Sequence, residues 1–226
     1  MLNTFFGNAM KLFLLPAMLC LLLGCNINHI IDGVHGNGEL KSENRTVATF
    51  TKVVVEGSMD VIATAGDSNQ TLSINADSNI LPIIKTEVKD GELHIYADKS
   101  YNSKNNVTIT LSTAMLNGLA VEGSGDIKAS NLNSDSLLID IDGSGDIALN
   151  GKTNALRIEV NGSGDIRAKE LVAGIVQIEI NGSGDVYTNV TTSLNVEVNG
   201  SGDVEYTGNP TTVNQSVNGS GSVRKR

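Results

Sequence analysis

A short glycine-rich phrase recurs through the second half of this 226-residue chain and limits what the chain can fold into. Its six copies read VEGSGDI, IDGSGDI, VNGSGDI, INGSGDV, VNGSGDV and VNGSGSV, and they begin at residues 121, 141, 160, 180, 198 and 217. The first glycines of these copies are separated by 20, 19, 20, 18 and 19 residues. A period of this length is typical of repeat architectures, in which each repeat is one structural unit that packs on its neighbours.

The residues around each phrase alternate between apolar and polar, which predicts short β-strands on both sides of it. β-Branched residues dominate the apolar positions, as is common in strands. Two residues before the first glycine stand Val121, Ile141, Val160, Ile180, Val198 and Val217, and four residues after it stand Ile127, Ile147, Ile166, Val186, Val204 and Val223. The sequence therefore predicts an all-β fold, a single-stranded parallel β-helix or β-solenoid with coils of about 19–20 residues.

Each copy of the phrase is either a binding site or a corner of the coil, and its residue types favour the corner. Glycine adopts the positive φ of tight turns without steric cost, and the following aspartate can accept a backbone N–H at the turn. The asparagines before the glycines are placed to form a hydrogen-bonded ladder between coils; they are Asn161, Asn181, Asn199 and Asn218. With an imperfect earlier copy, VEGSMDV at 55–61, the predicted turn residues are Gly57, Gly123, Gly125, Gly143, Gly145, Gly162, Gly164, Gly182, Gly184, Gly200, Gly202, Gly219 and Gly221.

The predicted solenoid covers residues 46–226, with an irregular first half over 46–112 and regular repeats over 113–226. The first half contains strand-like runs such as KVVVEGSMDVIAT and NVTITLS, and its Asp90-Gly91 pair suits a hairpin or a coil turn. No change in composition marks a linker between the halves. We therefore expect one continuous solenoid with an irregular start.

Residues 1–24 are predicted to be a lipoprotein signal peptide. The apolar run over 12–23 is too short to span a bilayer comfortably, and its ending LLGC resembles a bacterial lipobox with Cys25 as the lipidated residue. The alternative is an ordinary secretory signal with an incidental cysteine. Residues 25–45 are expected to be the lipidated cysteine and a polar tether, which anchors the chain in a membrane. Asn26 favours the outer membrane of a Gram-negative bacterium, and the side that the domain faces stays open.

The serial GSGDI phrases and the preceding run over 50–98 resemble the bacterial envelope family called "putative auto-transporter adhesin, head GIN domain". The resemblance extends over roughly residues 33–226. It implies a β-helical fold similar to pectate-lyase-like solenoids, with the glycine phrase at the turn between sheets. It also implies an adhesive role, and it carries no binding or catalytic residue to this chain.

One column of acidic residues is expected on the outer surface, three residues before each corner. Its members, the candidate interaction surface, are Asp140, Glu159, Glu179 and Glu197. Like charges at one-coil spacing repel, so the column could hold Ca²⁺ or a cationic partner. The favoured interpretation is that these side chains extend into water, helped by Arg157, Arg167 and Lys169.

A second acidic column follows the corner glycines. It comprises Asp126, Asp146, Asp165, Asp185 and Asp203. The comparison with calcium-binding nonapeptide repeats is disfavoured because the period here is near 19 residues and each aspartate directly follows a glycine. No metal is therefore expected to be required, and no other cofactor is predicted.

Catalysis is disfavoured because the acidic residues repeat along the chain instead of forming one distinguished cluster. The sequence has no GxSxG or HExxH motif, and of its three histidines only His94 lies in a predicted strand. A carbohydrate-active enzyme would need an aromatic groove, for which Tyr187 and Tyr206 on adjacent coils are the only indication. We therefore predict that the protein is not an enzyme.

The sequence favours a non-catalytic adhesion or interaction module that binds a glycan or protein surface through many weak contacts. The alternative is a periplasm-facing structural or regulatory scaffold. A formal net charge of −9 argues against nucleic acid and anionic lipid as partners. No heptad stalk is present, so a trimer is not predicted, and the oligomeric state stays open.

Overall fold

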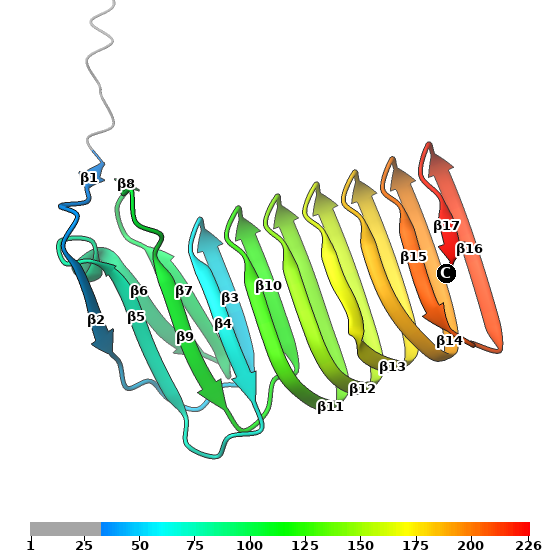
Figure 1. Ribbon diagram of the computed structural model, residues 1–226, viewed down its shortest axis with the longest axis horizontal. Helices are drawn as coiled ribbons and strands as arrows, with labels where there is room; N and C mark the ends of the chain where they lie inside the picture. The colour runs from blue at the N-terminus through cyan, green and yellow to red at the C-terminus, as the bar shows by residue number, and fades with distance from the viewer. Residues whose placement is uncertain (1–32) are drawn as a thin grey trace, which may run out of the picture. The chain divides into compact units, whose positions relative to one another are not determined.

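Alternating apolar and polar residues form parallel strands that stack coil on coil along the second half of the chain (Figure 1). The computed structural model describes residues 33–226, so the predicted signal peptide, Cys25 and the start of the predicted tether lie outside the described residues. Within that range there are seventeen β-strands and one 3₁₀ helix, η1 (Leu81–Ile83). No helix in the described range is long and apolar enough to cross a membrane. The predicted all-β solenoid is confirmed.

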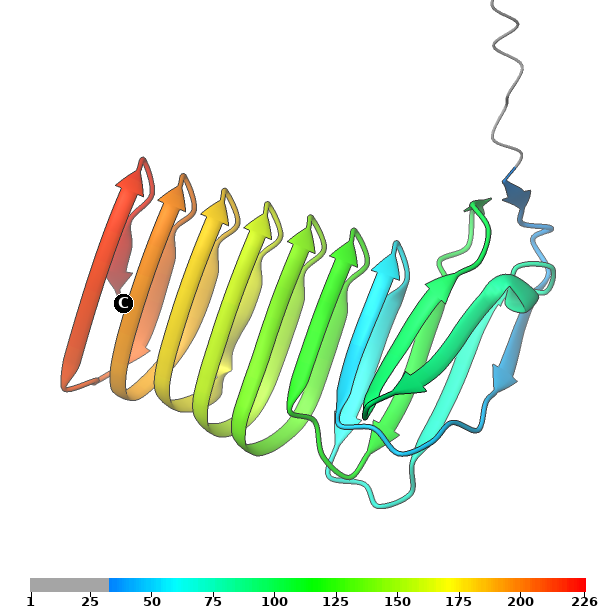
Figure 2. The same cartoon turned by 180° about the vertical axis from the view of Figure 1, so that it is seen from behind.

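The regular repeats are β10 (Gly118–Gly123), β11 (Ile127–Gly143), β12 (Ile147–Gly162), β13 (Ile166–Gly182), β14 (Val186–Gly200), β15 (Val204–Gly208), β16 (Thr212–Gly219) and β17 (Val223–Lys225). Each of β11 to β14 descends one side of the stack, turns through a wide lower bend and ascends the other side to the next corner (Figures 1 and 2). We call these sides the descending face (127–130, 147–150, 166–170, 186–190 and 204–208) and the ascending face (118–123, 136–143, 155–162, 175–182, 193–200 and 212–219).

The strands β11 to β14 are each 15–17 residues long, whereas the alternation predicts two short strands per coil. The lower bend has no corner that recurs in every coil. Hydrogen bonding to the next coil continues through it with shifts of register, and from β11 to β14 positive φ occurs there at Asn131 (+58°) and Gly151 (+128°). A gradual bend of this kind leaves no glycine phrase in the sequence. The coil therefore has one sharp end and one rounded end.

Between the two faces lies a continuous apolar interior. Ile139 pairs with Ile158, and Ile158 with Ile178, so the same apolar position stacks from coil to coil with at most 1% of each side chain exposed. Full burial of an isoleucine stabilises the folded state by roughly 1.5–3 kcal/mol relative to exposure. This repeated burial drives the stacking, since one coil alone cannot cover its own apolar side.

The first half supplies one coil and a covering layer of mixed strands. Its strands are β1 (Val34–His35), β2 (Leu40–Asn44), β3 (Lys52–Gly57), β4 (Asp60–Ala65), β5 (Thr71–Asp77), β6 (Ile84–Lys89), β7 (Glu92–Ala97), β8 (Tyr101–Asn102) and β9 (Thr108–Thr113). The coil β3–β4 pairs in parallel with β10 and β11 on one side and with β7 and β9 on the other. The pairs β6–β7, β5–β9 and β2–β5 are antiparallel, so the start is a different sheet arrangement and not a loosened version of the same coil.

The Asp90-Gly91 pair joins β6 to β7 as a hairpin, with φ values of +52° and +80°. Positive φ at both central residues is the requirement of a type I′ turn.

Part of the segment expected as a tether is also sheet, since β2 pairs with β5. Nearby, the buried Asp77 accepts hydrogen bonds from Ser103 Oγ (2.6 Å) and Asn105 Nδ2 (2.7 Å), which lower its pKa.

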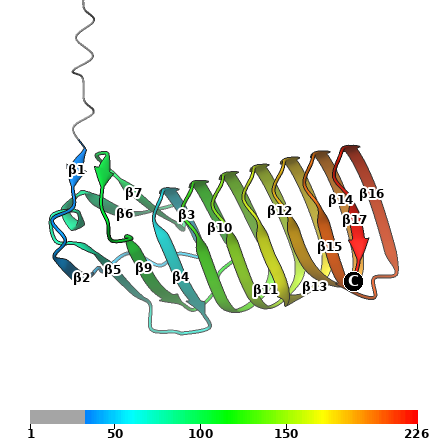
Figure 3. The same cartoon turned by 45° about the horizontal axis from the view of Figure 1, so that its top comes forward.

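The upper corners bring the backbones of successive coils into direct contact, and they form one row along the top of the stack (Figure 3). A Cβ added to Gly162 would lie 2.1 Å from the carbonyl oxygen of Gly143, and Gly162 has a φ of +146°. A clash of 2.0–2.5 Å with a carbonyl oxygen of the preceding coil would also occur at Gly123, Gly125, Gly143, Gly145, Gly164, Gly182, Gly184, Gly200, Gly202, Gly219 and Gly221.

The imperfect first copy has a physical explanation. No earlier corner lies within 4 Å of a Cβ built on Gly57, so this corner has free space on one side. Met59 stands where later copies have the second glycine, and its side chain is fully buried in the core. The first corner can therefore carry a large side chain that the others cannot.

We predict that Gly162→Ala destabilises the protein by at least about 2 kcal/mol, because the new methyl group meets a backbone carbonyl at a positive φ. Ser163→Ala is the matched control, since the Ser163 side chain at the same corner is exposed. Urea denaturation of both variants measures the difference. A Gly162→Ala protein within about 0.5 kcal/mol of the control would contradict the close stacking of corners.

Candidate functional site

The ascending face is the more acidic of the two faces of the regular coils. Its outward acidic side chains are Glu122, Asp140, Asp142, Glu159, Glu179 and Glu197, and its one basic residue from β10 to β16 is Arg157. The predicted column is aligned in space, since Asp140, Glu159, Glu179 and Glu197 are direct partners in successive coils.

Neighbouring polar groups disperse the charge of this column. The Arg157 guanidinium lies 3.6 Å from Glu159 and 3.7 Å from Glu179. Amide groups of Asn161, Asn181 and Asn199 donate to the glutamates two residues before them, and the asparagines also donate to each other at 3.0–3.1 Å from Asn161 to Asn218. The predicted asparagine ladder is therefore present.

Two of the three basic residues expected to help this column lie elsewhere. Arg167 and Lys169 follow a corner, so they project from the descending face on the other side of the core. Arg167 contacts Asp146 and Asp165, and Lys169 contacts Glu205. Only Arg157 contacts the acidic column, because it precedes its corner.

Asp140 is the member of the column with the most unfavourable surroundings for a charged carboxylate. Its Oδ1 atom is buried without a hydrogen-bond partner. Burial raises the pKa of Asp140, and repulsion from Glu159, Asp142 and Glu122 raises it further against the opposing effect of Arg157. A raised folded-state pKa means that ionised Asp140 destabilises the folded protein once the pH exceeds the carboxyl pKa of the unfolded chain.

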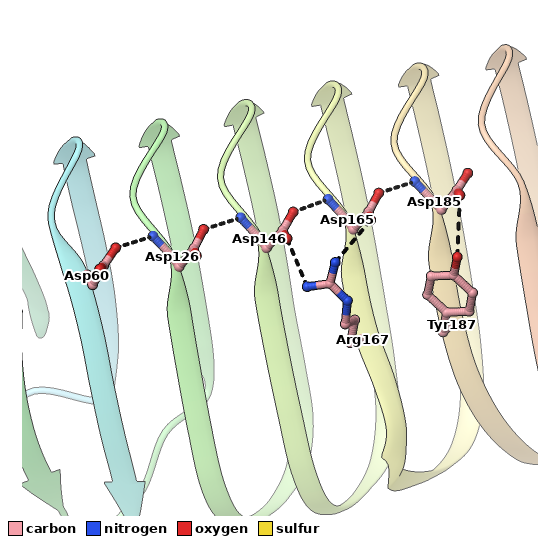
Figure 4. A network of polar contacts seen from close by, with 7 residues as sticks. All are labelled: Asp60, Asp126, Asp146, Asp165, Arg167, Asp185 and Tyr187. Atoms are coloured by element: carbon pink, nitrogen blue, oxygen red, sulfur yellow. Dashed lines mark hydrogen bonds and ion pairs between the residues drawn. The ribbon is translucent and has the colours of Figure 1, made fainter.

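The corner aspartates form a ladder of their own (Figure 4). Each backbone N–H donates to the carboxylate of the preceding coil, at 3.2 Å from Asp126 to Asp60 and at 2.8–3.0 Å from Asp146, Asp165, Asp185 and Asp203 to their predecessors. The Arg167 guanidinium joins two steps of the ladder through Asp146 and Asp165. The last copy replaces aspartate by Ser222, whose N–H and Oγ both donate to Asp203. These carboxylates join the coils, and this explains their place in the repeat.

Among residues 33–226, no three His, Cys, Asp or Glu side chains are placed to hold a metal ion. His94 lies on β7, where its ring nitrogens are 3.9 Å from Glu56 and Glu92. The carboxylates of the regular coils recur from coil to coil along each face. The arrangement suits repeated contacts with an extended partner.

The descending face contains a depression that sequence reasoning missed. Ala148 lies between Lys128 and Arg167 in register, and its small side chain leaves a hollow of about 500 Å³ between longer ones. A smaller hollow of about 250 Å³ continues from Arg167 and Lys169 to Tyr187. The sequence contains one indication of this hollow. In the outward row Lys128, Ala148, Arg167 and Tyr187, the alanine side chain is much smaller than its neighbours.

The two tyrosines expected to mark an aromatic groove point in different directions. Tyr187 pairs with Glu205 and faces outward, where Lys169 Nζ lies 4.8 Å from its ring centroid. Tyr206 pairs with the buried Thr188 and packs against the core. Tyr187 lines the smaller hollow of this face, together with Asp165, Arg167 and Lys169.

A broader hollow of about 800 Å³ lies along the lower bend. It includes Val172 and Ile175, which are 45% and 55% exposed. Their exposure has a local cause, since β13 has 17 residues and β14 has 15, and the register shifts between Ala168 and Ile175.

We predict that Asp140→Asn raises the melting temperature at pH 7 by about 1–2 °C, because the amide cannot ionise. The difference should disappear near pH 3, where Asp140 is largely protonated in both the folded and unfolded states. Glu197→Gln, at the exposed end of the same column, is the control and should change the melting temperature less. Thermal denaturation across this pH range tests the point, and a destabilised Asp140→Asn protein at pH 7 would contradict it.

Comparisons with known proteins agree with this architecture. The family model described as "putative auto-transporter adhesin, head GIN domain" matches residues 49–210. A putative adhesin from Bacteroides fragilis NCTC 9343 is 28% identical with a TM-score of 0.70, covering 86% of this chain and 100% of that one. A putative adhesin from Parabacteroides merdae ATCC 43184 is 20% identical with a TM-score of 0.55, covering 86% and 99%.

A putative lipid binding protein from Parabacteroides distasonis ATCC 8503 is 24% identical with a TM-score of 0.50, covering 85% of this chain and 99% of that one. This structure and the Parabacteroides merdae structure are similar in fold alone. No curated protein matches the chain. The family match spans more than half of the sequence and agrees with the corners and coils described above. The chain belongs to the putative auto-transporter adhesin, head GIN domain family.

Proposed function

We propose that this protein is a bacterial cell-envelope lipoprotein whose solenoid is a non-catalytic adhesion module. The observation that carries the proposal is the register of the coils, which repeats similar outward side chains in straight columns. The family and the Bacteroides fragilis structure, both described as putative adhesins, support the same role.

Columns of repeated groups suit binding by many weak contacts. Carboxylates recur on the ascending face at the spacing of parallel strands, about 4.8 Å. A partner with its own repeat, such as a polymer or a cell surface, can engage several coils together. Combined contacts of this kind give strong attachment although each one is weak.

The anchor in this proposal is a lipid on Cys25. Only eight residues, 26–33, separate that cysteine from β1, and eight extended residues reach at most about 28 Å. From β1 onward the chain is held by strand pairing, since β1 pairs with β8 and β2 pairs with β5. The module would therefore stay close to the membrane and bind partners that reach this surface.

The proposal predicts that protease added to intact cells removes the solenoid, because an adhesin has to face outward. Cells that produce the full-length chain are treated with a protease that cannot cross the outer membrane, and a periplasmic lipoprotein serves as the control. Antibody against the solenoid measures what remains. Survival of the solenoid until the outer membrane is opened would contradict the adhesin and favour the periplasm-facing scaffold.

The same cells test the anchor through a matched pair of cysteine variants. Cys25→Ser should release the chain from the membrane fraction, whereas Cys20→Ser should not, because Cys20 lies within the predicted signal peptide. Membrane association that is equal in the two variants would contradict lipidation at Cys25.

A further inference from the structure

We infer that the hollow over Ala148 on the descending face binds an uncharged saccharide chain laid along the solenoid axis. The inference rests on the proposed function, since it names the ligand class that the adhesion module would recognise. We call this hollow and its extension to Tyr187 the descending groove. The residues that line it and could contact a ligand include Ile62, Lys128, Ala148, Asn150, Arg167, Glu170 and Tyr187.

The descending groove runs across coils and not along one strand. Ile62, Lys128, Ala148, Arg167 and Tyr187 are consecutive partners in five neighbouring strands. Four steps between parallel strands span about 19 Å. One step is close to the length of one sugar residue in an extended glycan, so successive sugars can meet successive coils in the same way.

The lining matches the chemistry of a sugar ring. Hydroxyl groups need both donors and acceptors, and the groove offers Lys128, Arg167 and the Asn150 amide as donors and Glu170 as an acceptor. The Asn150 oxygen already accepts the backbone N–H of Asn131 at 2.9 Å. Arg167 is held in place by Asp146 at 2.8 Å and Asp165 at 3.2 Å, so its remaining donors are fixed in direction. The 46% exposed Ile62 and the methyl group of Ala148 supply apolar surface for the C–H face of a ring.

The charges of the groove favour an uncharged ligand. Arg167 is paired with two aspartates, and Lys169 shares Glu205 with Arg226. Lys128 and Glu170 have opposite signs, and neither is in an ion pair within residues 33–226. No net positive charge is left to attract an acidic glycan, and the formal charge of −9 on the chain repels one.

A peptide fits this face less well than a saccharide. Extended peptides bind sheets by pairing with a free strand edge. On the descending face the backbone groups of β11 to β14 are already used in the parallel pairing between coils. A ligand here can contact side chains alone, which is sufficient for hydroxyl recognition.

The test uses the purified full-length chain and a panel of soluble oligosaccharides of four to eight residues. Neutral members are β-glucan, xylan and mannan oligosaccharides, and acidic members are oligogalacturonate and hyaluronan oligosaccharides. We expect binding to at least one neutral member, and we expect Ala148→Phe to weaken it by about tenfold or more because the ring fills the groove. Ala120→Phe is the matched control, since Ala120 is an outward, half-buried alanine between neighbouring coils on the ascending face.

Equal loss of binding in both variants, no binding to any neutral member, or binding to acidic members alone would overturn the inference. Thermal denaturation of both variants shows whether they remain folded. Lys128→Ala provides a second variant that removes a donor from an exposed side chain.

Attachment of intact cells that produce the wild-type chain is measured in parallel. Attachment without neutral saccharide binding would reject this ligand and leave the proposed function standing, whereas absence of both would reject both.

Discussion

Successive coils of this protein approach each other so closely at the upper corners that no side chain fits between them. The added Cβ of almost any corner glycine would lie 2.0–2.5 Å from a carbonyl oxygen of the preceding coil. At the same corners, the serine N–H groups donate to glycine carbonyls of the preceding coil at 2.8–2.9 Å. This contact fixes the register, because a coil shifted by one residue would place a side chain against backbone. The straight columns of apolar side chains in the interior and the regular outer faces both depend on this fixed register.

Fixing the register makes the outer surface repetitive. The corner aspartates and the asparagine ladder are used to join coils, so their repetition needs no ligand to explain it. What remains is an acidic ascending face and a mixed descending face with a groove. The acidic ascending face is partly destabilising, because a buried carboxylate oxygen of Asp140 lacks a hydrogen-bond partner. The candidate functional surfaces are thus the side chains that the stacking itself does not use.

The sequence was most informative where the structure is periodic. The glycine phrase and the alternation of apolar residues were enough to predict coils, corners and the Asn161–Asn218 ladder, because one local pattern is repeated in one local geometry. The antiparallel pairs of the first half were not predicted, since their partners are set by contacts between distant segments without a repeat. Arg167 and Lys169 were placed beside the wrong acidic column because the side of the core depends on which residue turns the corner. The groove over Ala148 arises from one small side chain among longer ones, which is apparent only once the coils are aligned.

Amide hydrogen exchange at the corners tests the central claim most directly, namely that the repeated phrase joins coils and is not a row of exposed binding loops. The N–H groups of Asp146, Asp165 and Asp185 each donate to a carboxylate of the preceding coil at 2.9–3.0 Å. We predict that they exchange as slowly as the strand amides of Ile147 and Ile166, which are hydrogen-bonded to the next coil. Exchange of the corner amides at the rate of an unstructured peptide of the same sequence would show free loops and contradict the account.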